Sequence, residues 1–315
     1  MRLSRGRLRV RVPSLPPLIC LNNKYAIILK YRCYVLINMS KKNFLIKIWK
    51  IFSRLYVLIF GRKSLQCFND IILSLSLHAK GYKNYGNFRA TGEENFIKII
   101  SGEIKVCLDI GANIGNYSKL LLKETNAKVY AFEPMEKSFE ELKKIKEVYK
   151  DRFFIEQIAL GNEDGDKQIY SANNISEKAS LEKNLEKLSF IEKDNLKVFD
   201  VMIKKIDSLN FFDNNSKVDF VKIDVEGHEY EVIQGAKKFI DFNSPKFIQI
   251  EINWHQLFKK VNLFEFSKLL NDYEIFKILP HGKKLIFIDP TRPENNILHL
   301  SNFVFIRKDI SKKYK

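Results

Sequence analysis

Residues 106–118 read VCLDIGANIGNYS, and this stretch decides the fold that we expect for the chain. Its first five residues form a largely apolar run typical of a buried strand, and a helical pattern begins at Asn116. Gly111 and Gly115 lie between the two. Glycines at a strand-to-helix turn allow positive φ and a close approach of ligand, while the helix N-terminus presents free amide groups. The stretch therefore predicts a parallel α/β sheet with a nucleotide-like ligand at this turn.

From residue 100 onward, short apolar runs alternate with longer helical patterns, which is typical of a parallel sheet with helices on both faces. With 106–110, the expected strands of a seven-stranded sheet are 128–132, 153–158, 219–223, 247–252, 271–279 and 302–307. The segment 166–210 interrupts this alternation, and we expect an inserted β-hairpin there, with a loop near 176–195. The predicted fold class is α/β, a doubly wound Rossmann-like sheet with an N-terminal helical appendage.

The residues around the turn discriminate between nucleotide cofactors. Glu133 ends the second strand, 22 residues after Gly111, where an acid is placed to accept hydrogen bonds from ribose hydroxyls. A dinucleotide site requires G-x-G-x-x-G, but Asn113 stands at the position of the middle glycine. Asp109 would repel a pyrophosphate and can hold an ammonium group. A ligand with a ribose and an amino-acid cation but no phosphate is S-adenosylmethionine, which we predict as the cofactor. A tight turn in an unrelated α/β protein is the alternative.

Several motifs together resemble the FkbM family of S-adenosylmethionine-dependent methyltransferases. They are LDIGANIGNYS at 108–118, AFEP at 131–134, VKIDVEGHE at 221–229 with Gly235-Ala236, and the lead-in runs GYKNY at 81–85 and TGEENF at 91–96. The resemblance covers about residues 80–307, and KIDVEGHE is its most specific part. It implies a seven-stranded methyltransferase sheet whose last two strands form an antiparallel pair. It also implies O-methylation, often of sugars or secondary metabolites.

The same resemblance assigns the cofactor contacts residue by residue. Around the methionine end it implies Asp109, Gly111, Asn113 and Gly115, and around the ribose Glu133. Leu160, after the third strand, is expected to cover one face of the adenine. Asp224, after the fourth strand, is expected to position the cofactor.

The loop after the fourth strand lies at the carboxyl edge of the sheet, where open α/β sheets bind ligands. Methyl transfer to a hydroxyl requires a base, and the candidates are His228, Glu226, Asp224, Glu251 and His255. Histidine has the unperturbed pKa nearest neutrality, so His228 is the first candidate, with Glu226 orienting it or the acceptor. The alternative is that His228 only caps the following helix or hydrogen-bonds a neighbouring loop. No metal-binding motif is visible, and metal independence is expected.

The net charge of +17 is distributed unevenly along the chain. Before Asp70 there are 15 Lys and Arg residues and no acid, which leaves 39 bases against 37 acids from residue 70 on. A body so nearly neutral lacks the basic surface of a nucleic-acid enzyme, so no nucleic-acid partner is expected. The cysteines, Cys20, Cys33, Cys67 and Cys107, show no metal or disulfide spacing, which favours a reducing, cytoplasmic compartment.

The N-terminal fifth divides into two parts. Residues 1–38 form a basic, Arg-rich leader, and we hypothesise that Met39 is the native start, which mass spectrometry of the N-terminus tests. The alternative is a disordered basic arm that contacts membrane or nucleic acid. Residues 39–80 form an amphipathic helical segment, in which 44–60 carries Lys47, Lys50 and Arg54 on one helical face. This helix either lies on an anionic membrane at its cytoplasmic face or packs on its own protein or on a second subunit in a homo-oligomer. The methyltransferase domain is expected at 81–310, followed by a tail at 311–315.

These observations predict an S-adenosylmethionine-dependent methyltransferase acting on a hydroxyl of a saccharide, glycan precursor or secondary metabolite. Two alternatives stay open. One is an NAD-dependent Rossmann oxidoreductase, and the other is a non-catalytic, membrane-associated adaptor.

Overall fold

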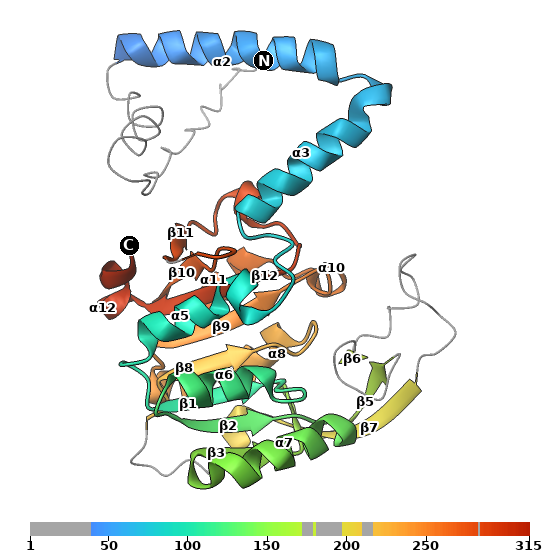
Figure 1. Cartoon of the computed structure of the whole chain (residues 1–315), viewed down its shortest axis with the longest axis vertical. Coiled ribbons are helices and arrows are strands. Elements are labelled where there is room, and N and C mark those ends of the chain that lie inside the picture. Colours follow the sequence, from blue (N-terminus) through green and yellow to red (C-terminus); the bar gives the residue numbers. More distant parts are fainter. Residues whose placement is uncertain (1–38, 172–178, 181–196, 210–216, 283) are drawn as a thin grey trace, which may run out of the picture. The chain divides into compact units, whose positions relative to one another are not determined.

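The computed structural model describes residues 39–171, 179–180, 197–209, 217–282 and 284–315 (Figure 1). The predicted leader at 1–38 and nearly all of the loop at 176–195 lie outside them. The chain divides into two compact units, with the boundary between Leu73 and Ser74. None of the described helices is long and apolar enough to cross a lipid bilayer.

The N-terminal unit is helical, with α2 (Met39–Phe60), the 3₁₀ turn η2 (Lys63–Leu65) and the start of α3 (Gln66–Ala79). The two α-helices contact each other near the turn that joins them. The Asn69 amide donates to the carbonyl oxygen of Phe60 at 2.8 Å, and Tyr56 Oη donates to Asn69 Oδ1 at 2.9 Å. The rings of Phe60 and Phe68 stack with centroids 5.1 Å apart. Asn69 therefore supplies a hydrogen-bond donor to the end of α2, where the helix leaves carbonyls unpaired.

The larger unit contains an eight-stranded sheet of order β11-β10-β12-β9-β8-β1-β2-β3. The strands are β1 (Val106–Ile110), β2 (Lys128–Phe132), β3 (Phe153–Glu156), β8 (Phe220–Ile223), β9 (Phe247–Ile252), β10 (Tyr273–Lys277), β11 (Ile286–Ile288) and β12 (Ser301–Arg307). The five neighbouring strands β3, β2, β1, β8 and β9 are parallel, and β12 is antiparallel to both β9 and β10. All seven expected strands are present, and the short β11 is added at one edge. The predicted doubly wound α/β fold is confirmed.

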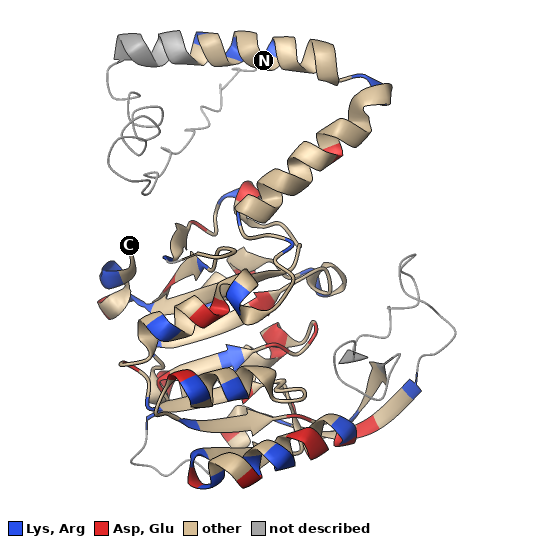
Figure 2. Ribbon diagram, viewed as in Figure 1, with Lys and Arg blue, Asp and Glu red and all other residues tan. Residues whose placement is uncertain are grey.

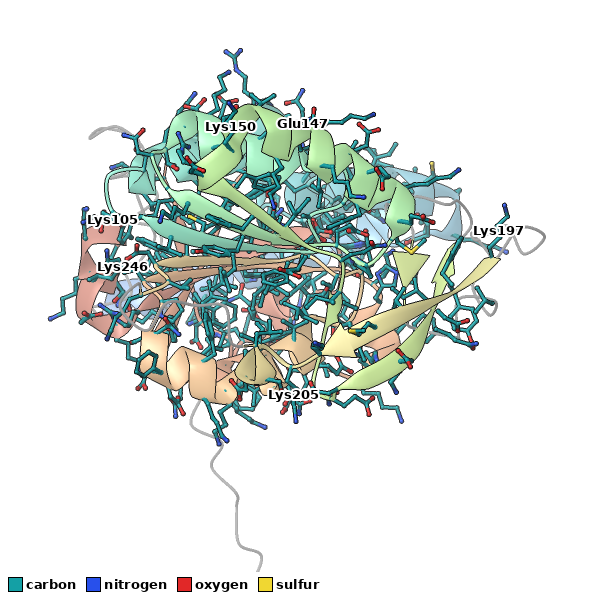
Figure 3. The ribbon with its side chains drawn as sticks, turned by 90° about the horizontal axis from the view of Figure 1, so that it is seen from below. Lys105, Glu147, Lys150, Lys197, Lys205 and Lys246 are labelled. Atoms are coloured by element: carbon teal, nitrogen blue, oxygen red, sulfur yellow. The ribbon has the colours of Figure 1, made fainter. Side chains whose placement is uncertain are left out.

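Helices cover both faces of this sheet, as Figure 3 shows for the body seen from below, with its labelled lysines spread around the rim. Each face has its own apolar core. One core receives side chains from α5 (Glu93–Ile100), α6 (Asn116–Glu124) and α7 (Glu136–Tyr149). The other receives them from α8 (Glu229–Gln234), α9 (Lys237–Asn243) and α11 (Leu263–Leu269). Adjacent strand residues alternate between the two cores, because side chains on a strand point to opposite faces.

The interruption after β3 forms a second, four-stranded sheet of order β4-β7-β5-β6. Its strands are β4 (Ala159–Leu160), β5 (Gly165–Ser171), β6 (Ala179–Ser180) and β7 (Lys197–Lys204). Because β5 and β7 pair antiparallel over their length, the predicted inserted hairpin is confirmed. Its apolar side chains, among them Ile169 and Ile203, form a small core with Met135, just after the end of β2.

The order of the parallel strands places the ligand site. The chain runs from β1 outward through β2 and β3, and then returns to the other side of β1 as β8. The carboxyl ends of β1 and β8 therefore form the point where the strand order reverses, and open α/β sheets bind their ligands in the crevice at such a point.

Candidate functional site

The loops that follow β1 and β8 lie in direct contact. Gly111, the first residue after β1, has φ +81°, a conformation that residues with a Cβ rarely adopt. A Cβ atom added there would lie 1.8 Å from the carbonyl oxygen of Asp224, the first residue after β8. Only glycine fits this position, and its absence of a side chain lets the two loops form one continuous wall.

Glu133, directly after β2, anchors the neighbouring part of this wall. Its side chain is buried, and its two carboxylate oxygens accept the backbone N–H groups of Asn113 and Met135, each at 2.9 Å. Asn113 has φ +51°, and its side-chain oxygen accepts from Ser138 Oγ at 3.2 Å. The carboxylate is therefore fixed at the end of β2 by the very loop that surrounds the predicted cofactor.

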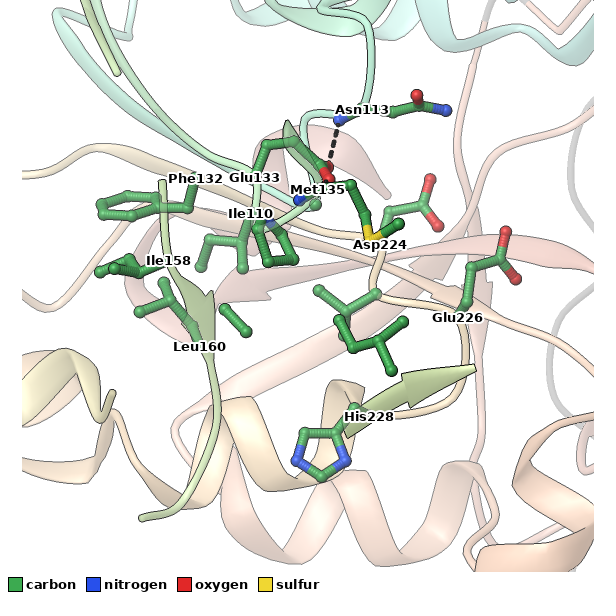
Figure 4. A pocket seen from close by; sticks show the side chains of 15 residues that line it. Ile110, Asn113, Phe132, Glu133, Met135, Ile158, Leu160, Asp224, Glu226 and His228 are labelled. Atoms are coloured by element: carbon green, nitrogen blue, oxygen red, sulfur yellow. Dashed lines mark hydrogen bonds between the residues drawn. The ribbon is translucent and has the colours of Figure 1, made fainter. Parts of the chain in front are cut away.

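A mostly apolar pocket of about 110 Å³ opens beside Glu133 (Figure 4). Its walls come from the ends of β1 and β2, from the β8 loop and from the segment 158–160. The side chains of Ile158 and Leu160 lie near Phe132 in this view. An apolar slot beside an acid that can accept hydrogen bonds fits an adenosine, whose base is flat and apolar and whose ribose carries hydroxyls.

A second, polar pocket of about 250 Å³ shares Gly111, Asn113 and Asp224 with the first. Its charged lining consists of Glu93, Asp109, Lys222, Asp224 and Glu251, and its polar lining includes Asn84, Thr91, Tyr117 and Asn302. A ligand that spans the shared wall would have an apolar nucleoside end and a charged end. The site therefore fits S-adenosylmethionine, the cofactor expected from the sequence.

Buried charges dominate the polar pocket. Lys222 is 2% exposed, and its Nζ lies 2.7 Å from Asp224 Oδ2. Burial alone would lower the pKa of Lys222, but the nearby Asp224 and Glu93 outweigh it and raise this pKa. Burial raises the pKa of Asp109 to about 6, although Ser118 Oγ donates to its carboxylate at 2.5 Å and opposes that rise. With four carboxylates and one lysine in the lining, the pocket favours a cationic ligand group.

Three acids meet where the two pockets join. One carboxylate oxygen from each of Asp224, Glu226 and Glu251 lies within 4.8 Å of the other two. Burial, followed by repulsion from Asp224, raises the pKa of Glu226 and of Glu251 well above the usual range. Such a group can hold a cation or retain a proton. Asp224 and Glu226 lie in the loop after β8 and Glu251 lies in β9, so the cluster forms no local motif in the sequence. Metal independence stays a prediction.

The β8 loop is held by a buried acid that the sequence analysis did not single out. Glu229 Oε1 accepts the backbone N–H groups of Gly227 at 2.9 Å and Val225 at 3.2 Å. Gly227 has φ +102°, and an added Cβ would lie 2.5 Å from the Cβ of His255. Burial raises the pKa of Glu229 to about 7, against the opposing effect of these hydrogen bonds. Glu229 thus orients the loop that carries Asp224 and Glu226.

The two histidines of this region occupy different places. His228 lies away from the carboxylates of Asp224 and Glu226 (Figure 4), and its Nε2 would be 3.1 Å from a Cβ added at Gly161, just after Leu160. Burial lowers the pKa of His228 to about 4. His228 is the N-cap residue of α8, but its side chain makes no capping hydrogen bond.

His255 lies beside the acid cluster. It is 7% exposed, its Nδ1 is 2.6 Å from Asn253 Oδ1 and 3.6 Å from Glu226 Oε2, and the ring of Trp254 stacks on it at 3.7 Å. Asn253 Nδ2 donates to the same Glu226 oxygen at 3.3 Å. His255 and Asn253 therefore orient the carboxylate of Glu226.

The structure brings most of the predicted site residues together. Lining one or both pockets are Asp109, Gly111, Asn113, Glu133, Leu160, Asp224, Glu226 and His228. Gly115 lines neither of these two pockets. A Cβ there would lie 2.2 Å from Ile145 Cδ1, so this glycine lets the start of α6 approach α7.

Sequence reasoning missed several buried polar residues of the polar pocket. Lys222 carried a visible signal, because a lysine inside the apolar run FVKI of β8 is unusual for a strand buried on both faces. Glu93 accepts from Thr91 Oγ1 at 2.8 Å and from Gln249 Nε2 at 2.7 Å. It lies in the lead-in run at 91–96, so the resemblance had marked the segment without assigning it a role.

The fold and the two joined pockets define a Rossmann-like α/β methyltransferase. The sequence profile of the methyltransferase FkbM domain matches residues 109–275, more than half of the chain. The chain belongs to this family. No curated protein matches the sequence.

Two solved methyltransferase structures are similar to this chain at a low level. One is methyltransferase FkbM from Methylobacillus flagellatus KT, with 14% identity and a TM-score of 0.39, covering 75% of this chain and 60% of that protein. Another is the plantazolicin methyltransferase BpumL in complex with SAH, with 12% identity and a TM-score of 0.39, covering 84% and 98%. At this low similarity, nothing about the acceptor follows from either. The chain spans well under two thirds of the length of the first protein.

Proposed function

We propose that this protein transfers the methyl group of S-adenosylmethionine to a hydroxyl oxygen. The observation that carries the proposal is the wall formed by Gly111, Asn113 and Asp224, which joins an apolar pocket beside Glu133 to a polar pocket rich in carboxylates. The bound cofactor supplies an activated methyl group. The protein therefore has to align the acceptor and remove its proton.

For the acceptor, we propose a saccharide, a glycan precursor or a secondary metabolite that carries a free hydroxyl. Asn84, Thr91 and Asn302 line the polar pocket and offer the hydrogen-bonding groups by which a polyhydroxylated molecule is oriented. The family membership is consistent with this class of acceptor. A role in glycan modification in the cytoplasm follows if the acceptor is a nascent glycan.

We assign the proton acceptor to Glu226. A raised pKa makes its carboxylate a stronger base once the group has lost its own proton, and Asn253 and His255 orient this carboxylate. The sequence favoured His228, whose neutral imidazole is available at pH 7. With a pKa of about 4 and a position beside Gly161, however, His228 is a weaker base on the adenine side of the pocket.

Two variants separate these assignments. Glu226→Gln should lower kcat by about 10²–10⁴-fold, the usual contribution of a general base, and leave the Kd for S-adenosylhomocysteine within about twofold. His228→Ala should change mainly that Kd. The reverse pattern, with kcat lost in His228→Ala and retained in Glu226→Gln, would return the base to His228.

Thermal shift measurements test the cofactor class against the oxidoreductase alternative. S-adenosylhomocysteine should raise the Tm, because a ligand that binds only the folded state stabilises it, and NAD at the same concentration should not. A shift with NAD alone would contradict the proposal. Shifts with neither ligand, together with no methyl transfer to a panel of saccharides, would favour the non-catalytic adaptor.

A further inference from the structure

Within the N-terminal unit, the helix α2 presents an apolar face that the other described residues of that unit leave exposed. Along this face lie Ile48, Trp49, Phe52, Leu55 and Ile59, all exposed, with Trp49 at 66%. At about 100° per residue, these five side chains fall within an arc of about 120° on the helix. An apolar surface of this kind with an aromatic residue near its centre marks an interaction site.

The opposite side of α2 is basic. Lys47, Lys50 and Arg54 are exposed and fall within about 60° of one another on the helix. Figure 2 shows Lys and Arg but no Asp or Glu along the described part of α2, whereas α7 carries both signs. The sequence contains no acid before Asp70. The partner of this helix must therefore tolerate or prefer positive charge.

We propose that α2 lies in the interface of an anionic lipid bilayer, with Trp49 and Phe52 at the level of the acyl chains and the three basic side chains at the phosphates. The helix has an extensive apolar surface, to which the exposed Val57 and Leu58 beside the basic residues also belong, and its charged residues are all basic. Together with too little apolar length to span the bilayer, these are properties of interfacial helices. The basic residues add attraction to an anionic leaflet. A dimer that packed the apolar faces of two copies would leave these cations on its outer sides, without the negative charge that an anionic leaflet supplies.

Binding of the full chain to lipid vesicles tests the proposal. The chain should co-sediment with vesicles of phosphatidylcholine containing about one third phosphatidylserine, and much less with phosphatidylcholine alone. Replacing Lys47, Lys50 and Arg54 by Gln should weaken binding about fivefold per residue, or roughly a hundredfold in total. The matched control replaces Lys119, Lys123 and Lys128 on the body by Gln, which removes the same charge and should leave binding unchanged.

A second variant examines the apolar face. Trp49→Ser with Phe52→Ser should reduce binding about tenfold or more, since buried apolar area drives insertion. Circular dichroism checks that the apolar variant keeps its helix content. If that variant misfolds, the charge variant still tests the proposal, because it keeps the apolar face intact. If the parent chain stays in the supernatant with anionic vesicles, the proposal is wrong. This holds both for a monomer and for a dimer in which a second copy covers Trp49. Equal binding by the apolar and body variants overturns it as well.

Discussion

Replacing Glu133 by Gln perturbs the part of the site on which the cofactor assignment depends most. The carboxylate is 1% exposed, and each of its oxygens accepts one backbone N–H at 2.9 Å, from Asn113 and from Met135. Glutamine keeps one acceptor oxygen and turns an NH₂ group toward the other amide. A buried N–H left without an acceptor costs about 1–3 kcal/mol, and the free energy of unfolding should fall by that amount.

The same substitution removes the charge that we propose accepts hydrogen bonds from the ribose. Hydrogen bonds to a charged group contribute about 1.5–3 kcal/mol, and ~1.4 kcal/mol is a tenfold change in affinity. We therefore expect the Kd for S-adenosylhomocysteine to rise about 10- to 100-fold in Glu133→Gln.

Isothermal titration calorimetry measures the change in Kd, and urea denaturation measures the change in stability. Glu136→Gln is the matched control, because Glu136 is exposed in the first turn of α7 and should leave both quantities unchanged. If Glu133→Gln binds S-adenosylhomocysteine as tightly as the parent chain, the ribose assignment is wrong. A lost affinity without lost stability would show that the two backbone hydrogen bonds do not hold the loop.

Two buried groups give further predictions. Burial lowers the pKa of Lys277 to about 6, although the rings of Tyr82 and Phe303 favour its charged form. At pH 7 the unfolded chain therefore binds one proton more than the folded chain, and the cost of burying Lys277 decreases as pH rises. Lys277→Met should raise the free energy of unfolding by a few kcal/mol at pH 7 and by ~1.4 kcal/mol less for each pH unit above it. An equal increase in urea titrations at pH 7 and 9 would mean that the folded lysine is charged. For Glu229, with a pKa raised to about 7, the folded state binds the extra proton and stability falls from about pH 4.5 to 7. Glu229→Gln should flatten this slope in pH-dependent melting curves, and an unchanged slope would refute the assignment.

The local pattern of the chain was sufficient to predict the elements that frame the site. The segments 106–110, 128–132 and 247–252 are strands with the same bounds in the structure. Each is a short apolar run bounded by polar or turn residues. Such a local pattern is enough to predict a buried strand, without knowledge of its distant neighbours. The hairpin after β3 was predictable for the same reason, since the alternation survives at its two ends.

The place of Glu133 and Gly111 in the pocket walls was also predictable. Their positions depend only on where β1 and β2 end, and the carboxyl ends of adjacent parallel strands meet at one edge of the sheet. The assignment of Gly115 to the cofactor stays a prediction, and the structure gives this glycine a packing role that its sequence signal did not distinguish, because a glycine in a turn has the same signal whether it faces a ligand or a helix. Its contact with Ile145 exists only once α7 packs against α6.

The sequence by itself determined the class of fold, the order of its strands along the chain and the residues at their carboxyl ends, because these follow from short-range patterns of apolar and turn residues. Only the tertiary structure decided which side chains share a pocket and which charges they retain. The strand β8 begins 110 residues after β1 ends, yet pairs with it and sets Asp224 against Gly111. The raised pKa of Glu226 and the lowered pKa of His228 likewise arise from burial, which depends on contacts between segments far apart in the chain.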